Sequence, residues 1–462
     1  MKGMISFLIM RGLGSFLLFG LLYAPASAQF GQGIYEFGVL PQSWQMNPAL
    51  SPDARLFVAL PGVTARLHAP AFTLSDVLLP VNNNQSRLDF TSVFERRSER
   101  SIDFAVAAQA DLLQIGFSPN EKSYFGMGSS IVLQTDLQLP VDMLRLAQNG
   151  NTDSYFRDNN IDLSATGLST IAYRQHHFAY SRTISEKWRV GGRIKYLQGM
   201  FALDSRDNKI ILHATTDSIR LETNTLIQTA GLPTLLNDSG ALSSNVVIES
   251  SDLIKFNRGT GMGYDFGLSF SPSERLKFSL SLTDFGSITW KQDVFAYSGG
   301  PKSYASSGIE YSLSADSLTN MEEQLKSTAD SLLNLLKFNK ATARAFQTGL
   351  RTGFHLAASY KASPHLQFGG IFSTQRTHKE LRSAFSSYIQ WNPGRLLQLR
   401  TAYTFAEGSG AHLGGGFCLN LGPIQWYLIS DNWSLLFLPE RSTLVHAQTG
   451  INLLFGSGKS RD

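Results

Sequence analysis

The residues with the clearest chemical potential are basic side chains that recur at alternate positions of several apolar stretches. Because residues i and i+2 of a strand share one face, these groups would line a common surface and attract the carboxylate of a solute. The alternative is structural: the charges keep such a surface hydrated, and acids such as Asp265 neutralise them. The set comprises Arg189, Arg193, Lys195, Arg275, Lys277, Arg351, His355 and Arg400.

Enzyme chemistry has no comparable support in the sequence. There is no His-Glu-x-x-His, Gly-x-Ser-x-Gly, P-loop or Cys-x-x-Cys motif. His176 and His177 are adjacent, so on a strand they face opposite sides and cannot chelate one metal. The single cysteine, Cys418, is expected to be a small apolar strand residue. We therefore expect a protein that is not an enzyme and has no cofactor and no metal.

The first 28 residues have the features of a secretion signal. Lys2 and Arg11 form a positive region before the apolar stretch Gly12–Tyr23, and Ala26-Ser27-Ala28 is a small-x-small cleavage site. The predicted mature chain begins at Gln29, and losing two basic residues reduces the net charge from +4 to +2. That charge is too weak to favour nucleic acid. An uncleaved membrane anchor is the alternative, but the apolar stretch is short for a span.

Alternation with a period of two dominates the mature sequence. Between Arg275 and Thr283, apolar side chains occupy the even positions and charged or hydroxyl side chains the odd ones. We expect Leu280 to face a bilayer and Ser281 to face an interior that hydrates charge. Similar alternation, with Leu350 on the apolar face, occurs over 188–200, 350–360, 397–405 and 445–455.

These segments predict an all-β fold, a transmembrane antiparallel β-barrel of about 14 strands. Barrel closure satisfies every backbone group through hydrogen bonds between strands. It also explains how an exported chain without disulfides would be stabilised. The predicted strands are 55–68, 101–117, 124–137, 161–182, 187–203, 258–270, 275–290, 345–360, 364–376, 385–391, 395–405, 411–420, 423–430 and 444–455.

Connections between the predicted strands alternate in length. Short turns alternate with excursions over roughly 138–160, 204–257, 291–344, 377–384 and 431–443, whereas 406–410 is short. Barrels have short periplasmic turns and longer extracellular loops, which fixes the expected orientation. Helices are predicted over Val141–Ala147 and Thr319–Phe338, the second with a capping box. It would cover the barrel mouth or, alternatively, gate it or dock a partner. Residues 208–228 are a candidate hairpin.

The segment Gln29–Asp53 is rich in turn residues and does not alternate. Its aromatic residues need a buried surface, so we predict a hatch in or under the lumen; the alternative is a periplasmic tail. The expected hatch residues are Trp44, Met46, Asn47 and Pro48. The expected organisation is a signal peptide (1–28), a hatch-like segment (29–54), a barrel (55–456) and a C-terminal tail (457–462).

The start Asn47-Pro48-Ala49 resembles that of long-chain fatty-acid transporter (FadL-like) barrels, in which an N-terminal hatch blocks the lumen. The chain resembles more closely a Bacteroidota outer-membrane barrel family of unknown function, and more distantly the barrels associated with type IX secretion. The tail after Phe455 departs from barrels that end on an aromatic residue. The motifs that carry the closer resemblance are Leu282, Asp284, Gly286 and Trp290, together with Asp431, Asn432 and Gly450 to Gly456.

The sequence and the resemblance together predict a protein of the Gram-negative outer membrane, placed there after cleavage near Ala28. We expect it to take up hydrophobic or amphipathic solutes. The alternative is a scaffold that does not transport and whose loops bind surface or secretion-system proteins. The expected partners are outer-membrane lipid and lipopolysaccharide, with hydrophobic small molecules or secretion-system proteins in addition.

Overall fold

The computed structural model describes most of the chain from Gly33 onwards. The described residues are 33–37, 40–50, 52, 54–68, 73, 78–82, 85–96, 101–149, 154–157, 160–205, 208–214, 219–233, 255–306, 337–342, 345–376, 381–406, 410–433 and 442–457. The predicted signal peptide and the tail from residue 458 lie outside this set. So does nearly all of the helix predicted at Thr319–Phe338, whose last two residues are described and are not helical.

Fourteen antiparallel strands form a closed barrel, as predicted. The first wall strand has two pieces, β1 (Ala54–Ala59) and β2 (Gly62–His68), and both pair with the last strand, β25 (Leu444–Ser457). The eighth is also split, into β18 (Phe346–Gly349) and β19 (Gly353–Ser363). The others are β5 (Ser101–Phe117), β6 (Ser123–Pro140), β8 (Gly167–Thr183), β9 (Trp188–Asp204), β13 (Gly259–Phe270), β14 (Leu276–Trp290), β20 (Leu366–Arg376), β21 (Leu381–Trp391), β22 (Leu397–Ala406), β23 (Gly410–Leu421) and β24 (Ile424–Ser430).

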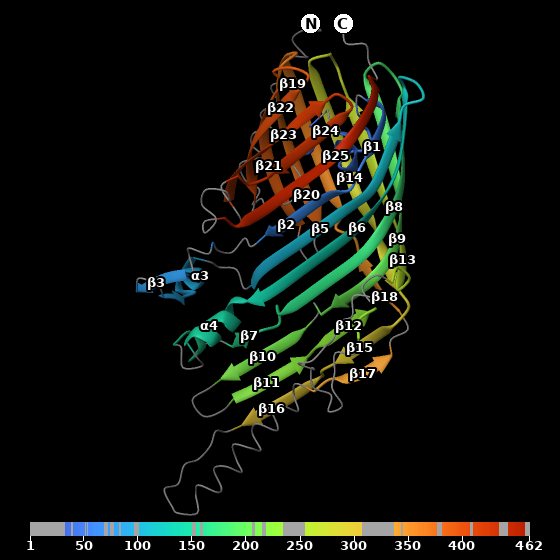
Figure 1. Ribbon diagram of the computed structural model, residues 1–462. Coiled ribbons are helices and arrows are strands. Elements are labelled where there is room, and N and C mark those ends of the chain that lie inside the picture. The colour runs from blue at the N-terminus through green and yellow to red at the C-terminus, as the bar shows by residue number, and fades with distance from the viewer. Residues whose placement is uncertain are drawn as a thin grey trace, which may run out of the picture.

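The two ends of the barrel differ (Figure 1). Short connections such as 118–122, 184–187 and 422–423 lie at the end where β1 begins and β25 finishes; we call this the short-turn end. The opposite, long-loop end carries the larger connections. These hold α3 (Thr91–Arg96), α4 (Val141–Asn149), η2 (Ser154–Arg157), β3 (Leu78–Asn82), β4 (Gln85–Leu88), β7 (Ile161–Asp162), β10 (Lys209–Ala214), β11 (Ile219–Asn224), β12 (Leu226–Ala230), β15 (Val294–Ser298), β16 (Lys302–Ser306) and β17 (Asn339–Thr342).

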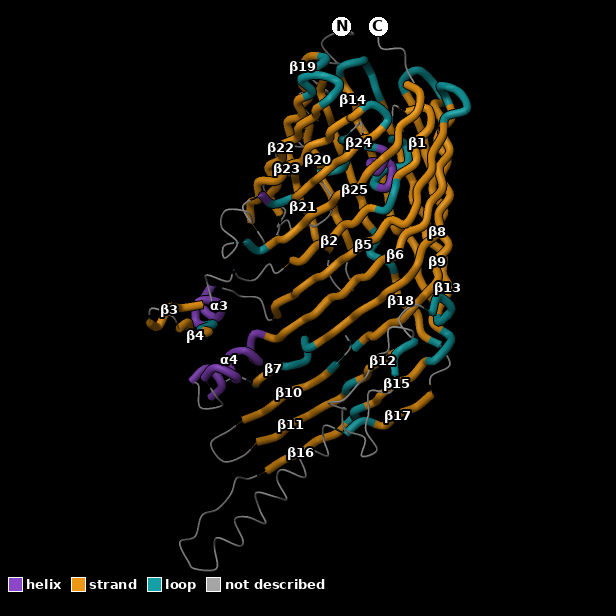
Figure 2. The backbone as a smooth tube through the Cα atoms, viewed as in Figure 1, coloured by secondary structure: helices purple, strands orange, loops and turns teal. Residues whose placement is uncertain are grey.

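The long-loop end has more regular structure than the sequence indicated (Figure 2). The predicted 208–228 hairpin is confirmed as β10 paired with β11, and β7 and β16 extend it to four strands. The predicted helix at Val141 is also confirmed, and it ends at Asn149. Among the described residues, no helix is both long and apolar enough to span a membrane.

The two faces of the barrel wall differ as the alternation predicted. Leu280 faces outward and is 38% exposed, whereas the next residue, Ser281, is completely buried inside. Exposed tryptophans lie on the outer surface near the short-turn end: Trp188, Trp391 and Trp426. An apolar outer band with an aromatic girdle is the arrangement that a bilayer requires of a barrel. The expected hydration of Ser281 is wrong, because its hydroxyl donates a hydrogen bond to the Met46 carbonyl (2.7 Å).

Leu280→Arg is expected to destabilise the barrel in lipid vesicles by about 2–4 kcal/mol, because the charge would sit on the bilayer face. Urea titration of the folded protein in vesicles measures the free energy of unfolding. Leu280→Ala is the matched control, since it shortens the same side chain without adding charge. If the arginine variant were no less stable than the alanine variant, residue 280 would not face lipid.

A β-bulge interrupts β14 at Asp284, whose φ is +56°. Asp265 on β13 faces two residues of β14 there, so the alternation of β14 reverses. Before the bulge, odd-numbered residues such as Ser281 face inward. After it, Phe285 is exposed, whereas Ile288 and Trp290 are completely buried inside. The bulge therefore turns two large apolar side chains towards the lumen, an arrangement that strict alternation did not predict.

The prediction is wrong for one residue of the apolar outer face. Leu350 was expected to face outward, but it is 7% exposed and belongs to the interior hydrophobic cluster around Trp290. The reason is the break between β18 and β19 at residues 350–352, where the strand loses its regular pleat. Leu350 and its neighbour Arg351 are therefore both buried.

Candidate functional site

The N-terminal segment lies inside the barrel, near the short-turn end. Its described residues, 33–37 and 40–50, are called the hatch from here on; they include the 3-10 turn η1 (Pro41–Gln45). Each of the fourteen wall strands supplies at least one residue to the hydrogen bonds, ring contacts, close approaches or hydrophobic clusters that hold the hatch. The hatch is thus gripped around the whole circumference of the lumen.

The Asn47-Pro48-Ala49 turn rests on a glycine seat. Gly191 on β9 and Gly267 on β13 are paired directly across the two strands. A Cβ atom built on either glycine would lie 2.7 Å from the backbone nitrogen of Ala49, too close for any side chain. Asn47 fixes the turn by donating to the Leu280 carbonyl (3.2 Å) and the Tyr35 hydroxyl (3.0 Å). This contact gives a physical reason for the Asn-Pro-Ala motif.

Two residues in the middle of the hatch, Trp44 and Met46, pack against the wall. Trp44 is buried among rings of the wall, with centroid distances of 5.9 Å to Tyr124 and 5.3 Å to His177. Met46 packs against two hydrophobic clusters, one containing Cys418 and one containing Tyr35. The predicted hatch residues Trp44, Met46, Asn47 and Pro48 therefore all lie at the contact between the hatch and the wall.

The first part of the hatch carries a buried carboxylate, Glu36. It accepts hydrogen bonds from Ser279 Oγ (2.8 Å) and the Tyr388 hydroxyl (3.1 Å), and Lys277 Nζ lies 3.8 Å away. Burial, together with the neighbouring Glu36, raises the pKa of Tyr35 to about 12. Its hydroxyl therefore stays protonated and able to donate. Glu36 has φ of +53°, a strained value for a residue with a side chain.

Two predicted basic residues bind the hatch backbone directly. Arg400 Nη1 donates to the carbonyls of Gly33 (3.1 Å) and Tyr35 (2.6 Å). Arg193 Nη2 donates to the Gln45 carbonyl (2.7 Å), and its Nε forms an ion pair with Asp265. Both side chains are buried, so their charges interact with groups of the wall and the hatch rather than with solvent.

The other predicted basic residues do not form one common patch. Lys195 bridges Asp265 (2.9 Å) and Asp284 (2.5 Å). Arg351 pairs with Asp136 (2.8 Å), and Arg189 donates to Ser181 (3.0 Å). His355 Nδ1 lies 2.8 Å from Ser373 Oγ, and the His355 ring is 5.6 Å from that of Tyr35. Arg275 is exposed in the turn before β14 and is not among the buried interior charges.

Sequence reasoning missed a second hatch contact, at Asp431. This residue follows β24 and folds back into the lumen, where Oδ1 accepts the backbone N–H of Gly33 (3.1 Å). Its other oxygen forms an ion pair with Arg66 and lies 3.2 Å from His446 Nδ1. The resemblance had singled out Asp431, but nothing in the alternation of β24 indicated that it turns inward.

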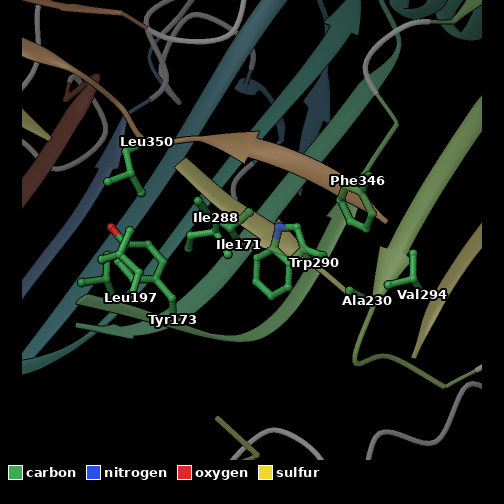
Figure 3. Close-up of a cluster of buried hydrophobic side chains, with 11 residues drawn as sticks. Ile171, Tyr173, Leu197, Ala230, Ile288, Trp290, Val294, Phe346 and Leu350 are labelled. Atoms are coloured by element: carbon green, nitrogen blue, oxygen red, sulfur yellow. The ribbon is translucent and has the colours of Figure 1, made fainter. Parts of the chain in front are cut away.

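Beyond the hatch, towards the long-loop end, part of the lumen wall is apolar (Figure 3). Trp290 lies against the wall at Gly199 and donates its Nε1–H to Thr348 Oγ1 (2.9 Å). The Phe346 ring stacks against Trp290 at 6.2 Å. The cluster consists of Val132, Ile171, Tyr173, Leu197, Ala202, Ala230, Ile288, Trp290, Val294, Phe346 and Leu350. We call it the apolar wall.

The fold and the site define a class of protein: a closed membrane barrel with an N-terminal hatch in its lumen. The chain belongs to the family described as a family of unknown function (DUF5723), whose model matches residues 48–431. The matched region runs from the hatch turn at Pro48 to Asp431, the residue that contacts the start of the hatch. No curated protein matches the sequence.

Several solved barrels are similar to the chain over most of its length. The toluene transporter TbuX of Ralstonia pickettii has a TM-score of 0.42 and 11% identity, covering 94% of this chain and 98% of that one. A Pseudomonas aeruginosa FadL homologue has a TM-score of 0.40 and 10% identity, covering 93% and 97%. The translocator domain of the Neisseria meningitidis autotransporter NalP has a TM-score of 0.34 and 8% identity, covering 87% and 89%.

Proposed function

We propose that this protein is an outer-membrane barrel that passes hydrophobic or amphipathic solutes, with the hatch closing the lumen between passages. The apolar wall carries this proposal. Barrel interiors are ordinarily polar, whereas ligand sites are lined mainly by apolar and aromatic side chains with a few polar groups. Trp290, Phe346 and Tyr173 supply such a lining beyond the hatch.

The proposed membrane is the Gram-negative outer membrane, because closed antiparallel barrels with this outer surface are built for it. The short-turn end would then face the periplasm and the long-loop end the exterior. Outer-membrane lipid and lipopolysaccharide would contact the exposed band that includes Leu280. No enzymatic role is proposed.

In this scheme the basic interior residues act first as holders of the hatch. Arg193 and Arg400 grip its carbonyls, and Arg351 is paired with Asp136. A solute carboxylate would therefore have to replace one of these partners rather than meet a free guanidinium. A purely apolar solute needs no such exchange, which favours hydrophobic over anionic cargo.

Trp290→Ala is expected to slow the uptake of naphthalene, a neutral apolar probe, by roughly 2- to 13-fold. This range corresponds to losing an aromatic contact worth about 0.5–1.5 kcal/mol. Uptake by cells or proteoliposomes containing the full mature chain measures the effect. Trp391→Ala is the matched control, because Trp391 lies exposed on the outer surface. Equal uptake by wild type and Trp290→Ala would contradict a role for the apolar wall.

A second candidate, a scaffold for surface or secretion proteins, rests on the structured long-loop end. There β7, β10, β11 and β16 form a separate four-stranded sheet that contributes nothing to barrel closure. Replacing 209–224 with a short turn would remove its two central strands. The scaffold function predicts that this variant loses partner capture while its naphthalene uptake is unchanged. The transport function predicts that the variant captures surface or secretion proteins no less than the wild type does.

A further inference from the structure

A chain of buried polar contacts connects the hatch to the β14 bulge. It begins at the Gln45 carbonyl, which accepts from Arg193 Nη2 (2.7 Å), and continues through the ion pair of Arg193 with Asp265. Asp265 Oδ1 then accepts the backbone N–H of Asp284 (2.7 Å), the residue at the bulge. Asp265 is completely buried, so these contacts are shielded from solvent screening.

Lys195 completes the arrangement around the bulge by bridging Asp265 and Asp284. Asp284 has positive φ, and such a conformation persists only where its surroundings impose it. The surroundings include Asp265, Lys195 and Thr352, whose hydroxyl donates to the Asp284 carbonyl (3.1 Å). The bulge in turn determines that Ile288 and Trp290 face the lumen. The same carboxylate thus holds both the hatch arginine and the backbone that shapes the apolar wall.

We propose that Asp265 is the positioning residue that couples solute binding at the apolar wall to release of the hatch; this inference rests on the proposed transport function. Because Ile288 and Trp290 are completely buried, a solute reaches them only by inserting into the apolar wall, and it then favours the β14 arrangement that gives it the most contact. That shift is passed through the Asp284 amide to Asp265, and from Asp265 to Arg193, which loosens the hold on Gln45. By linkage, a released hatch strengthens solute binding by the same factor.

The bulge accounts for one of the sequence motifs. In Leu282-x-Asp284-x-Gly286-x-x-x-Trp290, the aspartate forms the bulge and the tryptophan presents the apolar surface. Gly286 lies between them, where a Cβ atom would be 2.8 Å from the Cα of Gly263 on the neighbouring strand. Trp290 lies six positions after Asp284, an even number, so the reversed alternation that begins at the bulge turns its side chain into the lumen.

Cys418 provides a native reporter of hatch position. It is the only cysteine in the chain, is completely buried, and packs in the cluster that contains Ile34, Phe37 and Leu40 of the hatch. Met46, next to Gln45, packs against the same cluster. Displacement of the hatch would expose Cys418 to a water-soluble maleimide in the lumen. Its labelling rate therefore measures release without any engineered residue.

The experiment compares Cys418 labelling with and without naphthalene, in the full mature protein in lipid nanodiscs. We expect naphthalene to accelerate labelling about fivefold or more in the wild type, the lower range of typical coupling. In Arg193→Gln and Asp265→Asn the acceleration should fall below about twofold. Arg400→Gln is the matched control. It also removes an arginine from a hatch carbonyl, so its basal labelling should rise, but its response to naphthalene should remain.

The outcomes separate this inference from the transport function. If the wild type takes up naphthalene but Arg193→Gln and Asp265→Asn respond as strongly as it does, the coupling is overturned and transport stands. Uptake without any labelling response in the wild type overturns the coupling as well. If the wild type shows neither uptake nor response, the transport function fails, and the coupling with it. Should Asp265→Asn not fold, Arg193→Gln decides, because it leaves the Asp265–Lys195–Asp284 contacts in place.

Discussion

Replacing Gly191 with valine is expected to drive the hatch from its seat while the barrel itself remains closed. A Cβ atom at this position would lie 2.7 Å from the Ala49 nitrogen and closer still to the Pro48 carbonyl. These are backbone atoms, so they cannot rotate away as a side chain would. An overpacking penalty of about 1–3 kcal/mol, applied to the seated state alone, shifts the hatch equilibrium by roughly 5- to 150-fold.

Single-channel conductance in planar bilayers and Cys418 labelling both measure this shift, and both should rise. Gly192→Val is a close control. Gly192 neighbours Gly191 on β9, but the nearest atom to its added Cβ is the Asp265 carbonyl oxygen at 3.9 Å, an ordinary contact. Comparable conductance in the two variants, or a Gly191→Val barrel as closed as wild type, would show that the glycine seat does not hold the hatch.

The barrel wall was predictable because the alternation that defines each strand lies within that strand's own sequence. A strand with one face towards lipid must alternate, and 14 such segments separated by short and long connections indicate a closed barrel. Strand β14 shows the limit of this reasoning. Its alternation is regular up to Leu282, but the bulge at Asp284 depends on Asp265 of the neighbouring strand. The alternation before the bulge therefore gives no indication that Trp290 faces inward.

The site was predictable as a set of positions but not as a set of partners. Alternation indicated that Arg193, Lys195 and Arg400 face inward, and they are buried inside. What they contact depends on segments remote in sequence: Arg400 meets Gly33 and Tyr35. The glycine seat was missed for a related reason. The role of Gly191 and Gly267 can be recognised only when the register of β9 and β13 is known, because it is this register that places the two glycines together beneath Pro48.

Asp431→Ala is expected to lower the free energy of unfolding by about 3–5 kcal/mol, the usual effect of removing one partner from a buried ion pair. Asp431 and Arg66 are both 6% exposed, so little solvent is available to replace the lost carboxylate. The substitution also removes the acceptor of the Gly33 amide and the carboxylate beside His446. It should therefore weaken both the barrel wall and the start of the hatch.

A double variant separates these two effects. Replacing both partners, as Arg66→Met with Asp431→Leu, removes the buried charges together and should recover most of the stability, since such replacements are often neutral or stabilising. It cannot restore an acceptor for the Gly33 amide, so Cys418 labelling should stay faster than in the wild type. Urea unfolding in lipid vesicles measures the first quantity and maleimide labelling the second. If the double variant recovered both, Asp431 would serve the ion pair alone; if it recovered neither, the loss would not arise from breaking the Arg66–Asp431 ion pair.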